Sequence, residues 1–130
     1  MGKRISFAIA FLTGSGLIFI GVRFLLSPEI GEAGYGIHFN EQRDYSFHYI
    51  KGIRDLFTGL IICILILSKQ IKALGITLSV GTIIPIVDML IVLSKDYNGV
   101  AKAIPHLLAI IVCAVFGTIL LANKNSKQIL

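Results

Sequence analysis

Ionisable side chains lie inside stretches of this sequence that are otherwise almost purely apolar. Residues 47–67 carry His48, Lys51, Arg54 and Asp55 in their first half, and the rest of the stretch is uncharged. A charged group that faces hydrocarbon is costly, so such residues usually face a protein interior and pair with one another. These residue types therefore predict either a buried polar site or a set of ion pairs that holds helices together.

The other three apolar stretches each add one ionisable residue in their interior, namely Arg23, Asp88 and His106. Carboxylates and imidazoles can transfer protons when loss of water brings their pKa values toward neutrality. Guanidinium and ammonium groups can bind an anionic or carbonyl group. By residue type, the predicted proton-handling, or catalytic, residues are Asp55, Asp88 and His106. The predicted ligand-binding residues are Arg23, Arg54, Lys51 and His48. No metal site is predicted, because no HxxxH or Cys/His ligand spacing supports one.

The composition of the chain is that of a membrane protein. Of its 130 residues, 55% are hydrophobic and 15% are charged, and the mean hydropathy is +0.86. A soluble domain of this length cannot bury so much apolar surface. Four apolar runs have about the 20 residues that a helix needs to cross a bilayer, and these are 5–26, 47–67, 71–93 and 100–122. Lipid cannot satisfy free backbone groups, so the sequence predicts one all-α domain over residues 1–130, an integral membrane four-helix bundle with antiparallel neighbours.

The distribution of charge around these runs predicts their orientation. Lys and Arg occur without acids at the amino terminus, in the 68–72 connection and at the carboxyl terminus, whereas the 27–46 loop holds four acids and one Arg. The positive-inside rule then predicts a multi-pass protein of the cell (plasma) membrane with both termini in the cytoplasm. In that orientation the ionisable residues of all four helices lie at one level, roughly 5–12 Å below the outer boundary.

The 27–46 loop is the longest connection between the predicted helices. Three glycines and a proline argue against one continuous helix there, and leave a short interfacial helix or a folded-in lid as alternatives. All four tyrosines fall near the predicted outer side, which is typical of an interfacial aromatic belt. They are Tyr35, Tyr45, Tyr49 and Tyr97.

On each predicted helix, small residues share a face with the ionisable ones, and small faces let helices approach closely in lipid. These faces contain Gly16, Ile20 and Arg23; Gly52, Thr58, Gly59, Ile62 and Cys63; Gly81, Pro85 and Asp88; and His106, Ala109, Cys113 and Gly117. Pro85 also removes a backbone hydrogen bond to the carbonyl of Gly81, which predicts a kink at that point. The glycine-lined faces would permit a homo-oligomer.

Charge balance predicts how the buried ionisable groups pair. Two arginines oppose two aspartates at the same level. Arg54 and Asp55 point about 100° apart on a helix, so we expect each to pair mainly with another helix. The preferred pair joins Arg23 to Asp55 or Asp88. Lys51 is long enough to extend toward the outer headgroups.

Three segments carry a resemblance to a known family: "GVRFLLSPE", "YIKGIRDLFTGLIICILIL" and "VGTIIPIVDMLIVL". They resemble a family of small four-span membrane proteins catalogued as a domain of unknown function, which is distantly similar to the DoxX-like group. The most specific motifs are Gly-x-Arg at 21–23, Lys-Gly-x-Arg-Asp at 51–55 and Pro-x-x-Asp at 85–88. The resemblance implies four transmembrane helices and no established reaction. Some DoxX-like relatives are associated with quinone or thiol redox systems, but this chain has no CxxC pair.

Three functions fit these features. The first is a site in the outer leaflet that binds or converts a small amphiphilic or quinone-like ligand, with the 27–46 loop as a lid. The second is a structural or accessory subunit whose buried ion pairs only fix helix packing. The third is a small transporter, although the first helix lacks the embedded acid that small multidrug exporters use. The sequence does not decide whether the protein is an enzyme. It identifies no cofactor, and it contains no P-loop, GxGxxG or nucleic-acid-binding motif.

Overall fold

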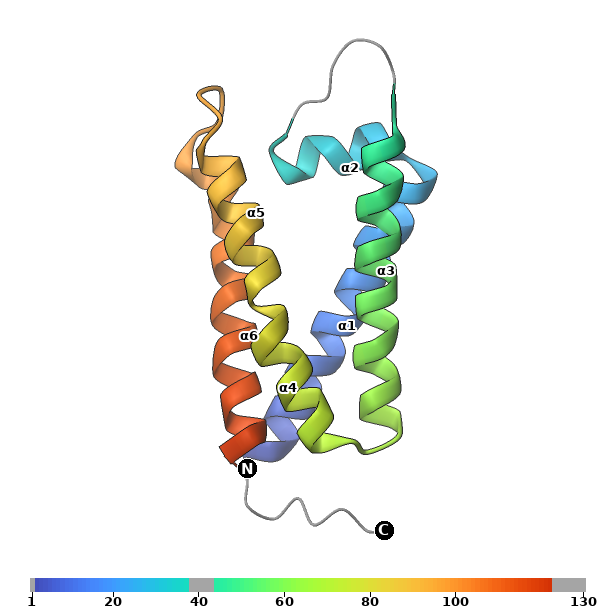
Figure 1. The fold of residues 1–130 in the computed structure, drawn as a ribbon, viewed down its shortest axis with the longest axis vertical. Coiled ribbons are helices and arrows are strands. Elements are labelled where there is room, and N and C mark those ends of the chain that lie inside the picture. Colours follow the sequence, from blue (N-terminus) through green and yellow to red (C-terminus); the bar gives the residue numbers. More distant parts are fainter. Residues whose placement is uncertain (1, 38–43, 123–130) are drawn as a thin grey trace.

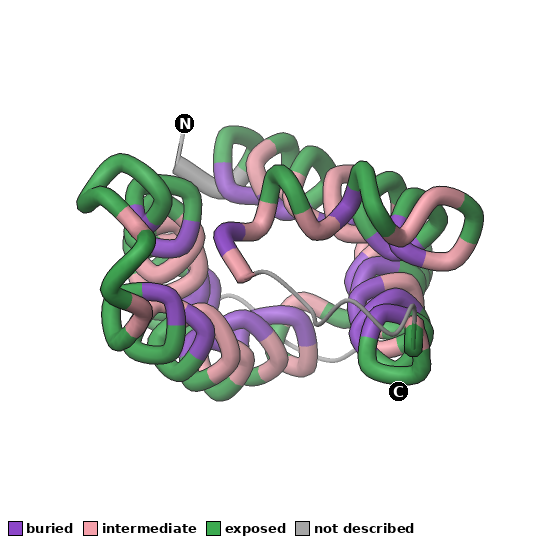
Figure 2. The backbone as a smooth tube through the Cα atoms, turned by 90° about the horizontal axis from the view of Figure 1, so that it is seen from above, coloured by how far each residue is buried: buried purple, intermediate pink, exposed green. Residues whose placement is uncertain are grey.

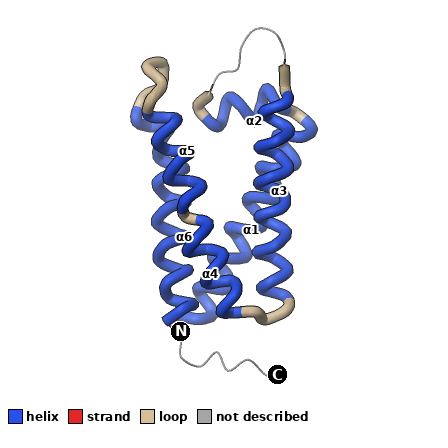
Figure 3. The backbone as a smooth tube through the Cα atoms, in the orientation of Figure 1, coloured by secondary structure: helices blue, strands red, loops and turns tan. Residues whose placement is uncertain are grey.

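The computed structural model describes residues 2–37 and 44–122, and this part of the chain is all-α, as predicted. The helices are α1 (Gly2–Leu26), α2 (Pro28–Tyr35), α3 (Ser46–Leu67), α4 (Ile71–Gly81), α5 (Ile83–Leu93), the 3-10 helix η1 (Val100–Ala103) and α6 (Ile104–Ala122) (Figure 1, Figure 3). Some residues behind the orientation prediction lie outside the described part, namely Glu41, Arg43, Lys124 and Lys127.

In the described part of the chain, three helical segments are long and apolar enough to cross a membrane, and these are Arg4–Leu26, Ile71–Leu93 and Val100–Ala122. Large apolar side chains also cover the outside of α3, among them Phe57, Leu60 and Ile64. Soluble proteins rarely expose contiguous apolar surface on this scale. The chain is therefore a helical membrane protein.

α1 and α3 pack backbone against backbone through glycines. A Cβ atom on Gly59 would lie 2.5 Å from the carbonyl oxygen of Gly14. A Cβ atom on Gly21 would lie 2.5 Å from the backbone nitrogen of Leu56. No side chain fits in either place, so the glycines set the distance between these two helices, as small residues commonly do in lipid.

The predicted contact face of the first helix is wrong at Gly16. A Cβ atom on Gly16 would have no neighbour within 4 Å, whereas Gly14 and Gly21 contact α3. Gly14 and Gly16 lie about 200° apart around a helix, so only one of them can face α3. Ile20 and Arg23, the other members of the predicted face, line the internal cavity.

A second close pair is formed by α4 and α6. A Cβ atom on Gly117 would lie 2.8 Å from the backbone nitrogen of Ser79. The buried core joins this pair to α1 and α3, and it consists of Ala10, Ile62, Leu74, Leu78 and Leu120. Buried residues face inward and exposed residues face outward around the bundle (Figure 2). The core lies at the end where α1 begins and α6 ends (Figure 1). The bundle has two halves, one made of α1 and α3 and the other of α4, α5 and α6. The two halves diverge toward the opposite end, which is the wider end of the bundle (Figure 1).

The predicted interruption of the third apolar run is confirmed. α4 ends at Gly81 and α5 begins at Ile83, with Thr82 between them. Pro85 has no N–H to donate to the carbonyl of Gly81, which accounts for the break. At the break, the Leu78 carbonyl accepts both the backbone N–H and the hydroxyl of Thr82, at 3.1 and 3.0 Å. Beyond the break, α5 packs on α6 and η1, while α3 packs on α1, so α5 and α3 lie on opposite sides of the wider end (Figure 1).

α2 lies across the wider end of the bundle, between α5 and α3 (Figure 1). Pro28 begins it, at a position where a missing N–H has no consequence for the helix. Gly36 ends it with φ +89°, a left-handed conformation that favours glycine. The short helix that was one alternative for the 27–46 loop is thus confirmed over Pro28–Tyr35.

Candidate functional site

A cavity of about 300 Å³ lies between the two halves of the bundle and beneath α2. Its apolar wall includes Leu17, Ile20, Ile62, Leu78, Ile84 and Cys113. Its polar residues include Arg23, Tyr35, Lys51, Asp55, Asp88 and His106. A mostly apolar cavity with a few convergent polar groups is the usual form of a small-molecule site.

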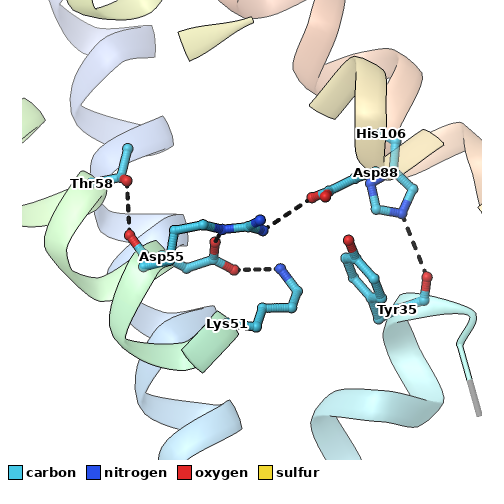
Figure 4. Close-up of polar contacts among 7 residues, drawn as sticks. Tyr35, Lys51, Asp55, Thr58, Asp88 and His106 are labelled. Atoms are coloured by element: carbon cyan, nitrogen blue, oxygen red, sulfur yellow. Dashed lines mark hydrogen bonds and ion pairs between the residues drawn. The ribbon is translucent and has the colours of Figure 1, made fainter. Parts of the chain in front are cut away.

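Four ionisable side chains of α3 and α5 form one connected chain of ion pairs (Figure 4). The ammonium group of Lys51 donates to Asp55 Oδ2 at 2.6 Å. Arg54 donates through Nε to Asp55 Oδ1 and through Nη2 to Asp88 Oδ2, both at 3.2 Å. The Lys51 and Asp55 side chains are only 5% and 6% exposed, so they form a desolvated pair. Through Arg54 and Asp88 the chain of pairs connects α3 to α5 across the wider end of the bundle.

The predicted pairing of these groups is wrong in three respects. Arg23 pairs with neither Asp55 nor Asp88, because Lys51 and Arg54 of α3 already occupy both carboxylates. Arg54 pairs across helices with Asp88, as expected, but it also binds its neighbour Asp55, which was not expected. Lys51 turns into the interior instead of extending toward headgroups, because Asp55 lies one helical turn away.

Tyr35 of α2 reaches into the site between the two halves of the bundle (Figure 4). Its ring lies edge-on to the His106 ring, with centroids 5.0 Å apart. The Lys51 nitrogen lies 4.2 Å from the Tyr35 ring centroid, within the range of a cation–π contact. Burial raises the pKa of the Tyr35 phenol, and the negative charge of Asp88 raises it further. Tyr35 therefore stays a neutral hydroxyl that can donate a hydrogen bond inside the site.

Sequence reasoning placed Tyr35 in an outer aromatic belt and missed this position. The available signal was weak, because Tyr35 stands between two glycines in a loop without helical periodicity. Only the contacts of α2 with the rest of the bundle bring it to the cavity.

The predicted residues divide into those that line the cavity and those that support it. Arg23, Lys51, Asp55, Asp88 and His106 line it, from four different helices. His48 and Arg54 are not part of the lining. Arg54 binds the two aspartates, and the buried His48 lies with Nε2 3.0 Å from Glu32 Oε2 on α2. Within the described ranges, no three His, Cys, Asp or Glu side chains are grouped to hold a metal ion.

A family model describes most of this structure, from the glycine contacts of α1 to the end of the core on α6. It matches residues 14–120, and its description is "domain of unknown function (DUF4267)". The chain belongs to the DUF4267 family. No curated protein and no solved structure is detectably similar to it. The expected membership of a family of unknown function is confirmed, whereas the distant similarity to the DoxX-like group stays a prediction.

In this DUF4267 domain, the carboxyl end of α2 is held by the segment that joins α5 to α6. The Asn98 amide donates to the Gly36 carbonyl at 2.5 Å and to the Val92 carbonyl at 2.9 Å. The Lys102 ammonium donates to the Ala33 carbonyl at 2.8 Å, a contact typical of a cation at a helix carboxyl end. His106 Nε2 lies 3.5 Å from the Tyr35 carbonyl oxygen. α2 is thus fastened over the cavity from the α5–α6 side, and by His48 from the α3 side.

We predict that Asn98→Ala loosens α2 without unfolding the bundle. The Gly36 carbonyl would lose its donor, whereas the Val92 carbonyl keeps the backbone N–H of Lys95, so the cost is roughly 1–3 kcal/mol for one unsatisfied carbonyl. Hydrogen exchange should speed up in residues 28–36 and stay unchanged in α6. The control is Ser68→Ala, which removes a hydroxyl bonded only to the Ile64 carbonyl at the far end of α3. Unchanged exchange over α2 in the Asn98 variant would show that this contact does not hold the helix.

Proposed function

We propose that this DUF4267 protein binds a small amphiphilic molecule within the membrane. The polar head would lie among the ionisable groups beneath α2, and the apolar part would lie along the cavity toward the core. The observation that carries this proposal is one cavity that joins both kinds of wall. Arg23, Lys51 and Asp88 line the same 300 Å³ space as Leu17 and Ile62.

The proposal includes α3 as a fourth membrane span and both termini in the cytoplasm. α3 has 22 residues, and its charged residues Lys51 and Asp55 are buried, while the half-buried Arg54 is paired with Asp55 and Asp88. Its opposite side exposes Ile53, Phe57 and Leu60, so the surface toward lipid is apolar. A helix of this length reaches across about 30 Å of hydrocarbon. The positive residues that flank the helices support this orientation.

The ion pairs also support a second function, that of a structural subunit. The chain from Lys51 through Asp55 and Arg54 to Asp88 connects α3 with α5 and would hold the helices in register without any ligand. The two functions differ in one respect. A structural role needs no space, whereas a binding role needs the cavity to stay open.

Blocking the cavity therefore tests the proposal, and the chain offers a matched pair of glycines. Gly81 and Gly16 both lie in helices, and a Cβ atom on either would have no neighbour within 4 Å. Of these two glycines, Gly81 lines the cavity and Gly16 does not. Gly81→Leu should fill part of the cavity while the fold is kept, and Gly16→Leu should place the same side chain on α1 at a residue that is not part of the cavity lining.

The measurement is photolabelling with a dodecanol that carries a diazirine near its chain end, in phosphatidylcholine nanodiscs. In the natural protein we expect labelling that excess dodecanol suppresses, on cavity residues of α1, α4 and α6. Gly81→Leu should reduce this saturable labelling at least about tenfold, and Gly16→Leu should leave it unchanged. Labelling that does not saturate, or that both variants keep equally, would exclude the cavity as a binding site.

A further inference from the structure

We propose that the ligand is an anion with a single hydrocarbon chain, and that Arg23 binds its carboxylate or phosphate head. This inference rests on the proposed function, since it names the class of molecule for the same cavity. Arg23 has no established role in the structure, as it takes no part in the chain of ion pairs.

Among the described residues that line the cavity or pair with its lining, one permanently charged cation has no acidic partner. Arg23 and Lys51 are the cations of the cavity lining, and Asp55 and Asp88 are its acids. Arg54 lies behind the lining and binds both acids. Lys51 and Arg54 share both acids between them. Arg23 lines the cavity, is exposed, and forms no ion pair within the described ranges. An anion that entered the cavity would meet this unmatched charge.

The acid Glu32 of α2 does not compensate Arg23. Its carboxylate lies 3.0 Å from His48 Nε2, and Glu32 is not part of the cavity wall. Glu29, at the start of α2, accepts a hydrogen bond from the Tyr45 hydroxyl outside the cavity. Both acids of α2 therefore have other partners, and neither forms an ion pair with the guanidinium of Arg23.

The shape of the wall below Arg23 suits one hydrocarbon chain. Arg23, Ile20, Leu17 and Thr13 line the cavity from α1 at intervals of three and four residues, so they form one helix face. From Arg23 to Thr13 this face extends about 15 Å, the length of an extended chain of roughly 12 carbons. A volume of about 300 Å³ lies at the lower end of the usual range for ligand sites, and is too small for the two chains of a phospholipid.

The chemistry of the guanidinium group favours an oxyanion head. Its planar donors match a carboxylate or phosphate in a two-point contact, and such charge-assisted bonds are about twice as strong as neutral ones. A quaternary ammonium head would instead be repelled by Arg23 and Lys51.

A purely structural role for Arg23 makes a different prediction. Near the carboxyl end of α1, its positive charge could favour the helix dipole or anchor the helix at the headgroups. An anchor affects stability or insertion and does not discriminate between ligand heads. Selectivity among ligands of equal chain length therefore separates the two roles.

The experiment compares four diazirine probes with the same twelve-carbon chain and different heads: an alcohol, a carboxylate, a phosphate and a trimethylammonium group. Each is titrated against the protein in phosphatidylcholine nanodiscs, and saturable labelling of the cavity gives its affinity. We expect the carboxylate or the phosphate to bind at least about tenfold more tightly than the alcohol. The better of the two identifies the kind of oxyanion.

Arg23→Gln should lower the affinity of the anionic probe to that of the alcohol for the same variant. Arg23→Lys should retain part of the selectivity, because it keeps the charge without the planar donors. The matched control is Arg4→Gln, at the other end of the same helix and outside the cavity lining. Labelling by the alcohol shows that each variant still forms the cavity.

Two results overturn the inference and leave the proposed function standing. One is saturable labelling by the alcohol with no preference for either anion. The other is an anion preference that Arg23→Gln does not reduce. Absence of saturable labelling by all four probes would instead overturn the proposed function, and the inference with it.

Discussion

Replacing Gly59 by valine should separate α1 from α3 and lower the free energy of unfolding by at least about 3 kcal/mol. A Cβ atom there would lie 2.5 Å from the Gly14 carbonyl oxygen and 2.8 Å from the Ile18 backbone nitrogen. Both neighbours are backbone atoms, so no side chain can rotate away and one helix must move. Adding one side chain to a well-packed contact usually costs about 1–3 kcal/mol, and a contact between two backbones belongs at the top of that range or above it.

Thermal unfolding in detergent measures this effect, and Gly16→Val provides its control. A Cβ atom on Gly16 has open space around it, so this variant should change stability by less than about 1 kcal/mol. Both substitutions introduce the same β-branched side chain into a helix, so differences in helix propensity cancel. Equal loss of stability in the two variants would mean that the close approach of α1 and α3 does not support the fold.

The buried face of α3 could be predicted because it depends on spacing alone. Residues at intervals of three and four share one side of a helix, and the ionisable residues follow that pattern. His48, Lys51 and Asp55 are all buried, as are Gly52 and Gly59 on the same side. The break before Pro85 was predictable for a similar reason, since a missing N–H acts on its own helix and needs no information about neighbours.

The contact face of α1 could not be chosen from the sequence. Gly14 and Gly16 are both small, and each offers a side that another helix could approach. The packing of α3 decides between them, because Gly59 and Ile62 lie against Gly14 and leave Gly16 open. Helix periodicity identifies the members of a face, but it does not say which of two small faces meets a partner.

The position of Tyr35 and the ion-pair partners depend on contacts between distant segments. Tyr35 reaches the cavity because Asn98, which follows it by more than sixty residues, holds the end of α2. Arg23 and Arg54 have the same charge and were expected at the same level, so composition does not show which of them binds Asp88. The answer depends on side-chain reach across the cavity, where Arg54 meets Asp88 at 3.2 Å.

Removing the carboxylate of Asp55 should be strongly destabilising, by about 3–5 kcal/mol for a buried pair that loses one partner. Asp55→Ala would leave the ammonium group of Lys51, only 5% exposed, without the acceptor that lies 2.6 Å away. Thermal unfolding in detergent measures the loss. Asp96→Asn, on an exposed aspartate of the α5–η1 connection, should have little effect and serves as control.

Replacing both partners of this pair should restore most of the lost stability. In Lys51→Met/Asp55→Leu no charge is left buried, and apolar side chains of similar size often replace a buried ion pair without loss. Arg54 would keep Asp88 as a partner. If the double variant were as unstable as Asp55→Ala, the pair would contribute stability beyond compensating two buried charges, and the structural role would gain support.

If the double variant is stable and still binds the dodecanol probe, the pair is needed for neither the fold nor the binding of neutral amphiphiles. A loss of anion selectivity in that stable variant would then show that Lys51 assists Arg23 at the head of the ligand.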